Sequence, residues 1–226
     1  YNPNDKIPSP FKPSWIYGYN QSIPILNFYT LKRNKIVFSS GINLVIYDSK
    51  QKHQKILSGH ENNISCTAKT QTGSYCISGD QGERPHLIIV WSVYDEQAIQ
   101  RIRNPHDVKT GRGGVDQVGM STDDKLLFSR GGVASDQSVC VWDWKDAPES
   151  PLAILSLKSG KIYNHLTPHP CEASMFLVTS KTTCLFFNYD DTHGELLQCN
   201  PGSVDKEFGR SSGHLTTAIF IRYTYI

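Results

Sequence analysis

The chain has 226 residues, of which 38% are hydrophobic and 19% are charged, a composition typical of a soluble globular protein with an apolar core. Its 23 basic and 21 acidic side chains give a formal net charge of +2, which argues against the strongly basic surface that nucleic-acid binding requires. No apolar run approaches the ~18 residues of a membrane-spanning helix, so we expect neither nucleic acid nor a membrane as a partner.

The predicted elements are short strands behind a proline-rich lead-in. Residues 1–14 contain four prolines and no periodic apolar pattern, and we predict a linker there. From residue 15 onward, short runs rich in β-branched and aromatic residues alternate with turn residues, which predicts strands. The predicted strands form three sets: 25–29, 35–40, 43–48 and 54–57; 63–69, 74–79, 87–92 and 98–102; 115–121, 125–130, 138–143 and 152–157.

These sets repeat around one aromatic position. When VIYD, IVWS, CVWD and LFFN are aligned, the aromatic residues fall 44, 51 and 45 residues apart. Four-stranded propeller blades marked by Gly-His and Trp-Asp dipeptides recur every ~40–45 residues. Both dipeptides are present, as Gly59–His60 and Trp142–Asp143. The aligned aromatic residues are Tyr47, Trp91, Trp142 and Phe187.

On these residues the chain resembles the WD-repeat β-propeller family. The resemblance implies an all-β fold with a partial propeller over residues 15–226, comprising about four blades and the start of a fifth near 213–222. Because a blade buries its faces only against neighbouring blades, the remaining blades are expected to lie outside this chain.

The same resemblance implies a structural hydrogen-bond chain within each complete blade. It joins a Gly-His histidine, a strand serine, a turn aspartate and a strand tryptophan. In the second blade Pro85 stands where the aspartate is expected, so we expect that network to lack its carboxylate, and His106 is a loose candidate for the histidine of the third. The matching residues are His60, Ser78 and Trp91 in the second blade and Ser129, Asp136 and Trp142 in the third.

Two glycine-rich stretches suggest phosphate binding at first sight. They are GDQG (79–82) and KTGRGGVDQVG (109–119). A phosphate loop needs backbone amides converging at a helix N-terminus, usually with a lysine. Both stretches lead instead into β-branched strands, and Glu83 would repel phosphate. We therefore predict that both are elongated turns.

The longer segment DQGERPHLIIVW (80–91) resembles one branch of WD-repeat proteins, which comprises echinoderm-type microtubule-associated proteins and large WD-repeat proteins of the ciliary axoneme. Further matching segments are WIYGYNQSIPI (15–25), NLVIYD (43–48), LSGHENNISC (57–66), DDKLLFS (123–129) and VCVWDW (139–144). Within this branch the chain fits best the WD-repeat members of the calmodulin- and spoke-associated complex at the base of radial spokes.

The residues that could support other chemistry lack the required spacing. The six cysteines include no Cys-x-x-Cys, and the eight histidines show no metal-ligand spacing. An EF-hand starting at Asn188 would need Gly and Glu where His193 and Cys199 stand, so a surface hairpin turn is predicted there. We therefore expect no catalytic, cofactor-binding or metal site. Arg84, His86 and Arg112 are candidate partner contacts on the rim.

The resemblance implies a non-enzymatic scaffold in the axoneme of the cilium or flagellum. Such a protein would help to anchor radial spokes to doublet microtubules and would support ciliary motility. Its expected partners are other axonemal proteins, including radial-spoke-base and calmodulin- and spoke-associated complex subunits, and the doublet microtubule, with no cofactor and no small-molecule substrate. Two alternatives stay open: a cytoplasmic echinoderm-type microtubule-binding protein, and an adaptor of a multi-subunit complex such as a ubiquitin ligase.

Overall fold

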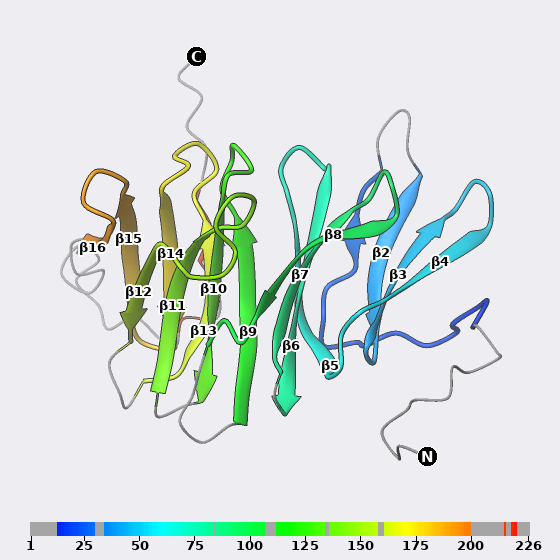
Figure 1. Ribbon diagram of the computed structural model, residues 1–226, viewed down its shortest axis with the longest axis horizontal. Coiled ribbons are helices and arrows are strands. Elements are labelled where there is room, and N and C mark those ends of the chain that lie inside the picture. Colours follow the sequence, from blue (N-terminus) through cyan, green and yellow to red (C-terminus); the bar gives the residue numbers. More distant parts are fainter. Residues whose placement is uncertain are drawn as a thin grey trace.

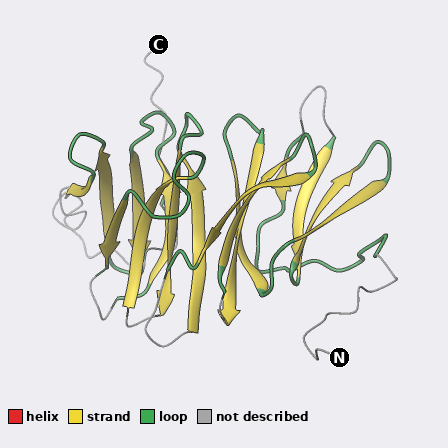
Figure 2. Cartoon of the chain, viewed as in Figure 1, coloured by secondary structure: helices red, strands yellow, loops and turns green. Residues whose placement is uncertain are grey.

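The computed structural model describes residues 13–29, 34–83, 85–106, 112–133, 136–157, 161–199, 215 and 218–220. These residues form sixteen strands and no helix (Figure 2). Consecutive strands pair antiparallel in four groups of four, which we call units 1 to 4. The predicted all-β class is confirmed.

The four units follow one another along the chain and lie side by side in a row (Figure 1). Unit 1 contains β1 (Leu26–Asn27), β2 (Lys35–Ser40), β3 (Asn43–Asp48) and β4 (His53–Ser58). Unit 2 contains β5 (Asn63–Lys69), β6 (Tyr75–Glu83), β7 (Leu87–Ser92) and β8 (Gln97–Arg103). Unit 3 contains β9 (Arg112–Met120), β10 (Leu126–Val133), β11 (Asp136–Asp143) and β12 (Ala153–Ser156). Unit 4 contains β13 (Tyr163–Pro168), β14 (Met175–Ser180), β15 (Cys184–Asp190) and β16 (Glu195–Cys199).

All twelve predicted strands are present, and β2, β3, β5 and β7 have the predicted bounds. In unit 4, only β15 was anticipated, by the aligned segment LFFN (185–188), and β13, β14 and β16 were not predicted. In β13 the register shifts between Tyr163 and His165, which breaks the alternation of buried and exposed residues on which strand prediction relies. Residues 1–12 of the predicted linker lie outside the described residues. Of the predicted fifth set, only residues 215 and 218–220 are described, and they lie in no strand.

The apolar run of β7 shows why the units stack. All six residues of this strand are buried, although side chains alternate between the two faces of a sheet. Leu87, Ile89 and Trp91 enter the core between units 1 and 2. Ile88 and Val90 enter the core between units 2 and 3. Unit 2 is therefore covered on both faces.

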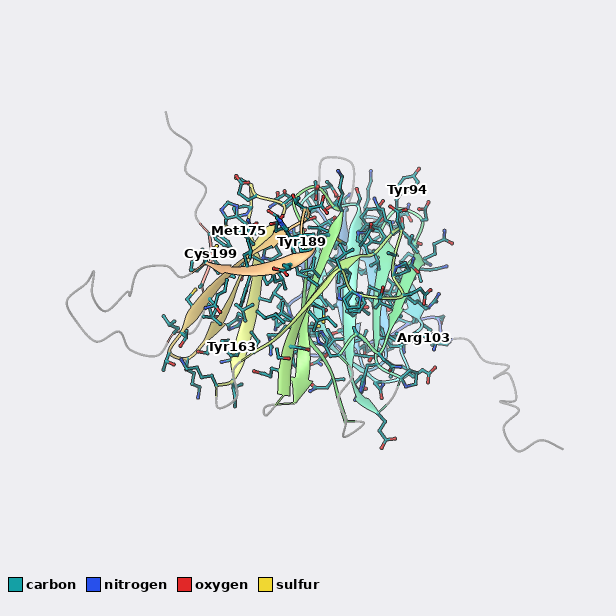
Figure 3. All side chains as sticks on the ribbon, turned by 60° about the vertical axis from the view of Figure 1, so that its left-hand side comes forward. Tyr94, Arg103, Tyr163, Met175, Tyr189 and Cys199 are labelled. Atoms are coloured by element: carbon teal, nitrogen blue, oxygen red, sulfur yellow. The ribbon has the colours of Figure 1, made fainter. Side chains whose placement is uncertain are left out.

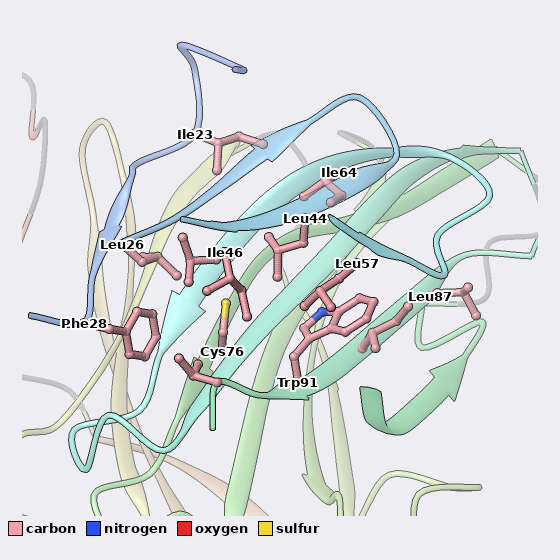
Figure 4. Close-up of a cluster of buried hydrophobic side chains, with 13 residues drawn as sticks. Ile23, Leu26, Phe28, Leu44, Ile46, Leu57, Ile64, Cys76, Leu87 and Trp91 are labelled. Carbon is pink, nitrogen blue, oxygen red and sulfur yellow. The ribbon is translucent and has the colours of Figure 1, made fainter. Parts of the chain in front are cut away.

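Each pair of neighbouring units shares one apolar core. Figure 4 shows the core between units 1 and 2, in which Leu44, Ile46 and Leu57 face Ile64, Cys76 and Trp91. Residues of units 2 and 3 meet in a second core that contains Ile77, Val118, Leu127, Trp142 and Trp144. A third core joins units 3 and 4 through Phe128, Val141, Phe176, Val178 and Phe187.

In their described residues, 79–82 and 112–119, the two glycine-rich stretches are strands and not turns, so that prediction was wrong. Strand β6 continues to Glu83 and pairs with the start of β9, with Gln81 opposite Gly114 and Gly82 opposite Gly113. Units 2 and 3 thereby form one eight-stranded sheet. Gly114 has a φ of +131°, and a Cβ there would lie 2.6 Å from the carbonyl oxygen of Asp80. Glycine is needed because two backbones approach closely at this junction.

The two ends of the row carry aromatic side chains on their outer faces. Beyond unit 1, Gln54 exchanges two hydrogen bonds with the backbone of Ile16, and Trp15 contacts Tyr47 edge-on at 6.2 Å. Beyond unit 4, Phe220 lies 5.9 Å from Phe186. Short chain segments thus lie over both outer faces, yet Trp15 remains 40% exposed.

Gly114→Ala tests the junction between units 2 and 3. The added Cβ meets backbone atoms rather than a flexible side chain, in a conformation that L-residues rarely adopt. We expect a loss of about 3 kcal/mol in the free energy of unfolding, measured by urea denaturation.

Gly18→Ala is the matched control, because a Cβ at Gly18 has no atom within 4 Å. Its effect should stay within about 0.5 kcal/mol. Equal losses for the two variants would contradict the close approach of the backbones at Gly114.

Candidate functional site: two histidine-centred networks

A buried hydrogen-bond network in unit 2 links the segment before β5 to β6 and β7. The indole Nε1 of Trp91 donates to Ser78 Oγ at 2.7 Å, and Ser78 Oγ lies 2.6 Å from His60 Nε2. On the other side of the ring, His60 Nδ1 lies 2.7 Å from Asp80 Oδ2, and both side chains are fully buried. The second carboxylate oxygen of Asp80 accepts the amide of Leu87 at 2.9 Å.

The donor and acceptor groups of these side chains determine the direction of each hydrogen bond in the network. An ionised carboxylate only accepts hydrogen bonds, so Nδ1 of His60 carries the proton that faces Asp80. Nε2 then accepts the hydroxyl hydrogen of Ser78, while a lone pair of Ser78 Oγ accepts the indole N–H of Trp91. Each of these groups is satisfied, which avoids the cost of burying an unpaired polar atom.

Asp80 corrects the expectation that this network lacks a carboxylate. The aspartate was expected six residues before Trp91, where Pro85 stands, and a proline side chain cannot accept a hydrogen bond. Because β6 continues past Ser78, Asp80 lies two residues farther along the same strand and on the same face. The Ser-x-Asp pattern at 78–80 was the signal in the sequence, but it was missed because Asp80 was predicted to lie in a turn after the strand.

Unit 3 contains a second network with a different partner for the histidine. Ser129 Oγ accepts the indole N–H of Trp142 at 2.8 Å and lies 3.0 Å from His106 Nε2. The hydroxyl of Ser138 lies 2.8 Å from Nδ1 of the same ring. His106 therefore takes the place that its sequence position only loosely suggested. Asp136 begins β11, but its side chain lies outside the described part of the chain.

The environment of His106 favours its neutral form. Burial lowers the pKa of His106 to about 3, and the positive charges of Arg130 and His86 contribute in the same direction. Arg130 itself is buried and pairs with Asp116 at 3.0 Å. This pair was not predicted, because Asp116 and Arg130 lie on different strands, β9 and β10.

Of the three candidate rim residues, only His86 has a described side chain. His86 is buried, with 1% of its surface exposed, and its backbone is bonded to Asn104. This position differs from the exposed one that the sequence suggested. Arg84 lies outside the described residues, and Arg112 is described only through its backbone in β9.

Further polar contacts tie neighbouring units together. Lys35 Nζ lies 2.7 Å from the carboxylate of Glu96, which joins unit 1 to unit 2. The hydroxyl of Thr72 donates to Asp124 at 2.6 Å and joins unit 2 to unit 3. These contacts fix the lateral positions of units that apolar packing alone would hold less specifically.

The described residues contain no group of three or more His, Cys, Asp or Glu side chains suited to hold a metal ion. The region proposed from sequence as a surface hairpin turn is confirmed, since Asp190 pairs with Glu195 across the turn between β15 and β16. The described residues form no helix, and so they contain no helix that could cross a membrane.

The fold and the two networks define an all-β protein built from repeated four-stranded antiparallel units. The model of the CFAP251 N-terminal domain matches residues 11–225, and the chain belongs to this family.

Similar curated proteins carry names that refer to cilia and flagella. The cilia- and flagella-associated protein 251 of Mus musculus is 26% identical over 212 residues, covering 93% of this chain and 16% of that protein. The Chlamydomonas reinhardtii protein of the same name is 21% identical, covering 92% of this chain and 27% of that protein. The human cilia- and flagella-associated protein 52 is 26% identical, covering 84% of this chain and 30% of that protein.

The chain therefore spans less than a third of the length of each of these relatives. The relatives support the predicted localisation in the cilium or flagellum and, more generally, a ciliary role.

Solved structures share the fold at low sequence identity. The crystal structure of Kluyvelomyces marxianus Hsv2 superimposes with a TM-score of 0.56 at 16% identity, covering 74% of this chain and 54% of that one. U3-55K superimposes with a TM-score of 0.57 at 12% identity, covering 76% of this chain and 51% of that one.

Asp80→Ala tests the network of unit 2. The substitution leaves His60 Nδ1 and the amide of Leu87 buried without an acceptor, so we expect a loss of about 3 kcal/mol in the free energy of unfolding. Asp146→Ala, at an exposed position, should change it by less than about 0.5 kcal/mol. Similar small effects of both substitutions in urea denaturation would show that the network does not stabilise the fold.

The lowered pKa of His106 predicts how the free energy of unfolding depends on pH. Its pKa in the folded protein lies below the ordinary 6.5, so the unfolded chain binds the extra proton between pH 6.5 and about 3. Stability should fall with decreasing pH in this window, by at most about 1.4 kcal/mol per pH unit from this group.

In His106→Gln this contribution should be lost, and the slope of the free energy of unfolding against pH should decrease accordingly. His53→Gln, at an exposed histidine, should leave the slope unchanged. An unchanged slope in His106→Gln would show that His106 is not held neutral.

Proposed function

We propose that the chain forms part of a WD-repeat β-propeller and acts as a non-enzymatic structural scaffold of the ciliary axoneme. In this role it helps to anchor radial spokes to doublet microtubules and supports ciliary motility. Its partners are subunits of the radial-spoke base and of the calmodulin- and spoke-associated complex, together with the doublet microtubule. The family match over residues 11–225 is the observation that carries this proposal.

The repeated units support a propeller. Propeller blades are four-stranded antiparallel sheets stacked radially, so that their first strands gather near the axis. In this chain β5 contacts both β1 and β9, and β9 contacts β13. Units 2 and 3 also repeat one hydrogen-bond pattern, with histidine, serine and tryptophan in equivalent places.

The ends of the row support a larger, closed arrangement. Tyr17 and Tyr19, beside Trp15 on the outer side of unit 1, are 94% and 51% exposed. Aromatic side chains of this size are normally buried against another surface. Further blades of the same longer polypeptide would cover them, which agrees with a chain that spans only part of its relatives.

The chemistry of the interior supports a scaffold rather than an enzyme. Both described network histidines, His60 and His106, are buried, and both nitrogens of each ring are bonded to neighbouring side chains. The thiols of Cys66 and Cys140 have pKa values raised to about 12 by burial, which disfavours the reactive thiolate. A rigid stack of sheets can hold its surface loops in fixed positions for partner binding.

Fractionation of ciliated cells tests this proposal. We expect an antibody against the chain to detect the protein in isolated axonemes after detergent and high-salt extraction, together with radial-spoke proteins. Tubulin and a soluble cytosolic enzyme mark the two fractions. Recovery of the protein mainly in the soluble pool would contradict a spoke-base role and favour a cytoplasmic microtubule-binding protein or an adaptor. Recovery on microtubules assembled from purified tubulin alone would specifically favour direct microtubule binding.

A further inference from the structure

A groove of about 520 Å³ opens between units 3 and 4. It lies where β10 and β11 of unit 3 meet the β13–β14 turn and the end of β15, at the upper end of the molecule in Figure 1. Acidic side chains from four separate segments line it: Asp123, Asp143, Glu172 and Asp191. Separate segments of a packed interface thus bring like charges together, and this costs free energy unless a cation compensates them.

One cation, Lys125, also lines the groove, and it compensates the acidic groups only in part. Its ammonium group is 4.0 Å from Asp123 Oδ2 and its side chain is 79% exposed. Asp123 is further bonded to Ser121, and Asp143 accepts the amides of the turn that follows β11.

The other two acidic groups are Glu172 and Asp191. Within the described part of the chain, the carboxylates of Glu172 and Asp191 have neither a hydrogen-bond nor an ion-pair partner. A surplus of negative charge therefore faces the groove.

Tyr189 supplies an independent observation. Only 6% of this residue is exposed, and its ring belongs to the core between units 3 and 4. The residue lines the groove near the upper end of unit 4 (Figure 3), and its hydroxyl has no hydrogen-bond partner among the described residues. Burial raises the pKa of Tyr189, and the nearby Asp191, Asp190 and Asp143 raise it further, so the hydroxyl stays protonated. The ring of Tyr189 is thus buried, and its neutral hydroxyl oxygen can accept a hydrogen bond from a ligand in the groove.

We propose that this groove binds a lysine or arginine side chain from a basic segment of a partner protein. The carboxylates compensate its charge, and the hydroxyl of Tyr189 accepts one of its N–H groups. Leu126 and Leu152, which also line the groove, contact the aliphatic part of the side chain. The inference stands on the groove alone and does not depend on the proposed ciliary function.

The chemistry of the groove disfavours other ligands. Anionic ligands such as phosphate would be repelled by the surplus of carboxylates. The carboxylates also do not form a cluster suited to a metal ion within the described residues. An arginine or lysine side chain, in contrast, can contact carboxylates that are spread along a groove. The charge of a guanidinium group is delocalised over several N–H donors, and the ammonium group of lysine is carried on a flexible aliphatic chain.

Fluorescence polarisation with the purified full-length protein tests the proposal. The probe is a fluorescein-labelled peptide of alternating arginine and serine residues, and the control peptide has citrulline in place of arginine. We expect the arginine peptide to bind and the citrulline peptide to bind at least about tenfold more weakly, since citrulline keeps the shape but lacks the charge.

Substitutions in the groove should weaken binding of the arginine peptide without unfolding the protein. Glu172→Gln combined with Asp191→Asn should weaken it by about tenfold. Tyr189→Phe, which removes only the hydroxyl, should weaken it by about fivefold. The matched control combines Glu61→Gln with Glu149→Gln, which removes the same charge at exposed positions outside the groove and should change affinity by less than about twofold.

Four outcomes would overturn the proposal. The first is an absence of binding by the unsubstituted protein, and the second is equal binding of the arginine and citrulline peptides. The third is an equal loss in the groove and control variants, which would indicate diffuse attraction to surface charge. The fourth is displacement of the peptide by millimolar calcium chloride beyond the effect of sodium chloride at matched ionic strength, which would make a metal ion the ligand.

Discussion

Burial of apolar side chains on both faces of a sheet is the constraint on which the rest of this structure depends. Strand β7 is buried along its whole length, and its alternate residues enter two separate cores. A sheet of this kind is stable only between two others, so each unit needs its neighbours. The same requirement explains why chain segments carrying Trp15 and Phe220 lie over the outer faces of units 1 and 4.

Polar groups inside the stack make this packing specific. The apolar cores would tolerate some sliding of one unit past the next, but directional hydrogen bonds do not. In unit 2 the histidine faces the carboxylate of Asp80, whereas in unit 3 it faces the hydroxyl of Ser138. Both arrangements satisfy the two ring nitrogens of a buried histidine. The interior therefore maintains geometry, and interactions with partners are left to the ends and edges of the sheets.

The groove between units 3 and 4 shows how such a stack creates a binding surface. Its acidic side chains belong to turns and strand ends, while Tyr189 is anchored by its ring in the core beneath them. Rigid sheets hold these groups in place, so a ligand would bind without much loss of conformational freedom in the protein. A scaffold can in this way present charge at a defined position without any catalytic machinery.

The strands of units 1 to 3 and the members His60, Ser78 and Trp91 of the unit 2 network followed from sequence, because side-chain periodicity and dipeptide motifs are local properties. Three features did not follow: the pairing of β6 with β9, the use of Asp80, and the convergence of acidic residues around Tyr189. A glycine-rich segment has no side chains to reveal whether it turns or pairs with a distant strand. Contacts between residues far apart in the chain arise only when the units pack, so the tertiary structure alone decided them.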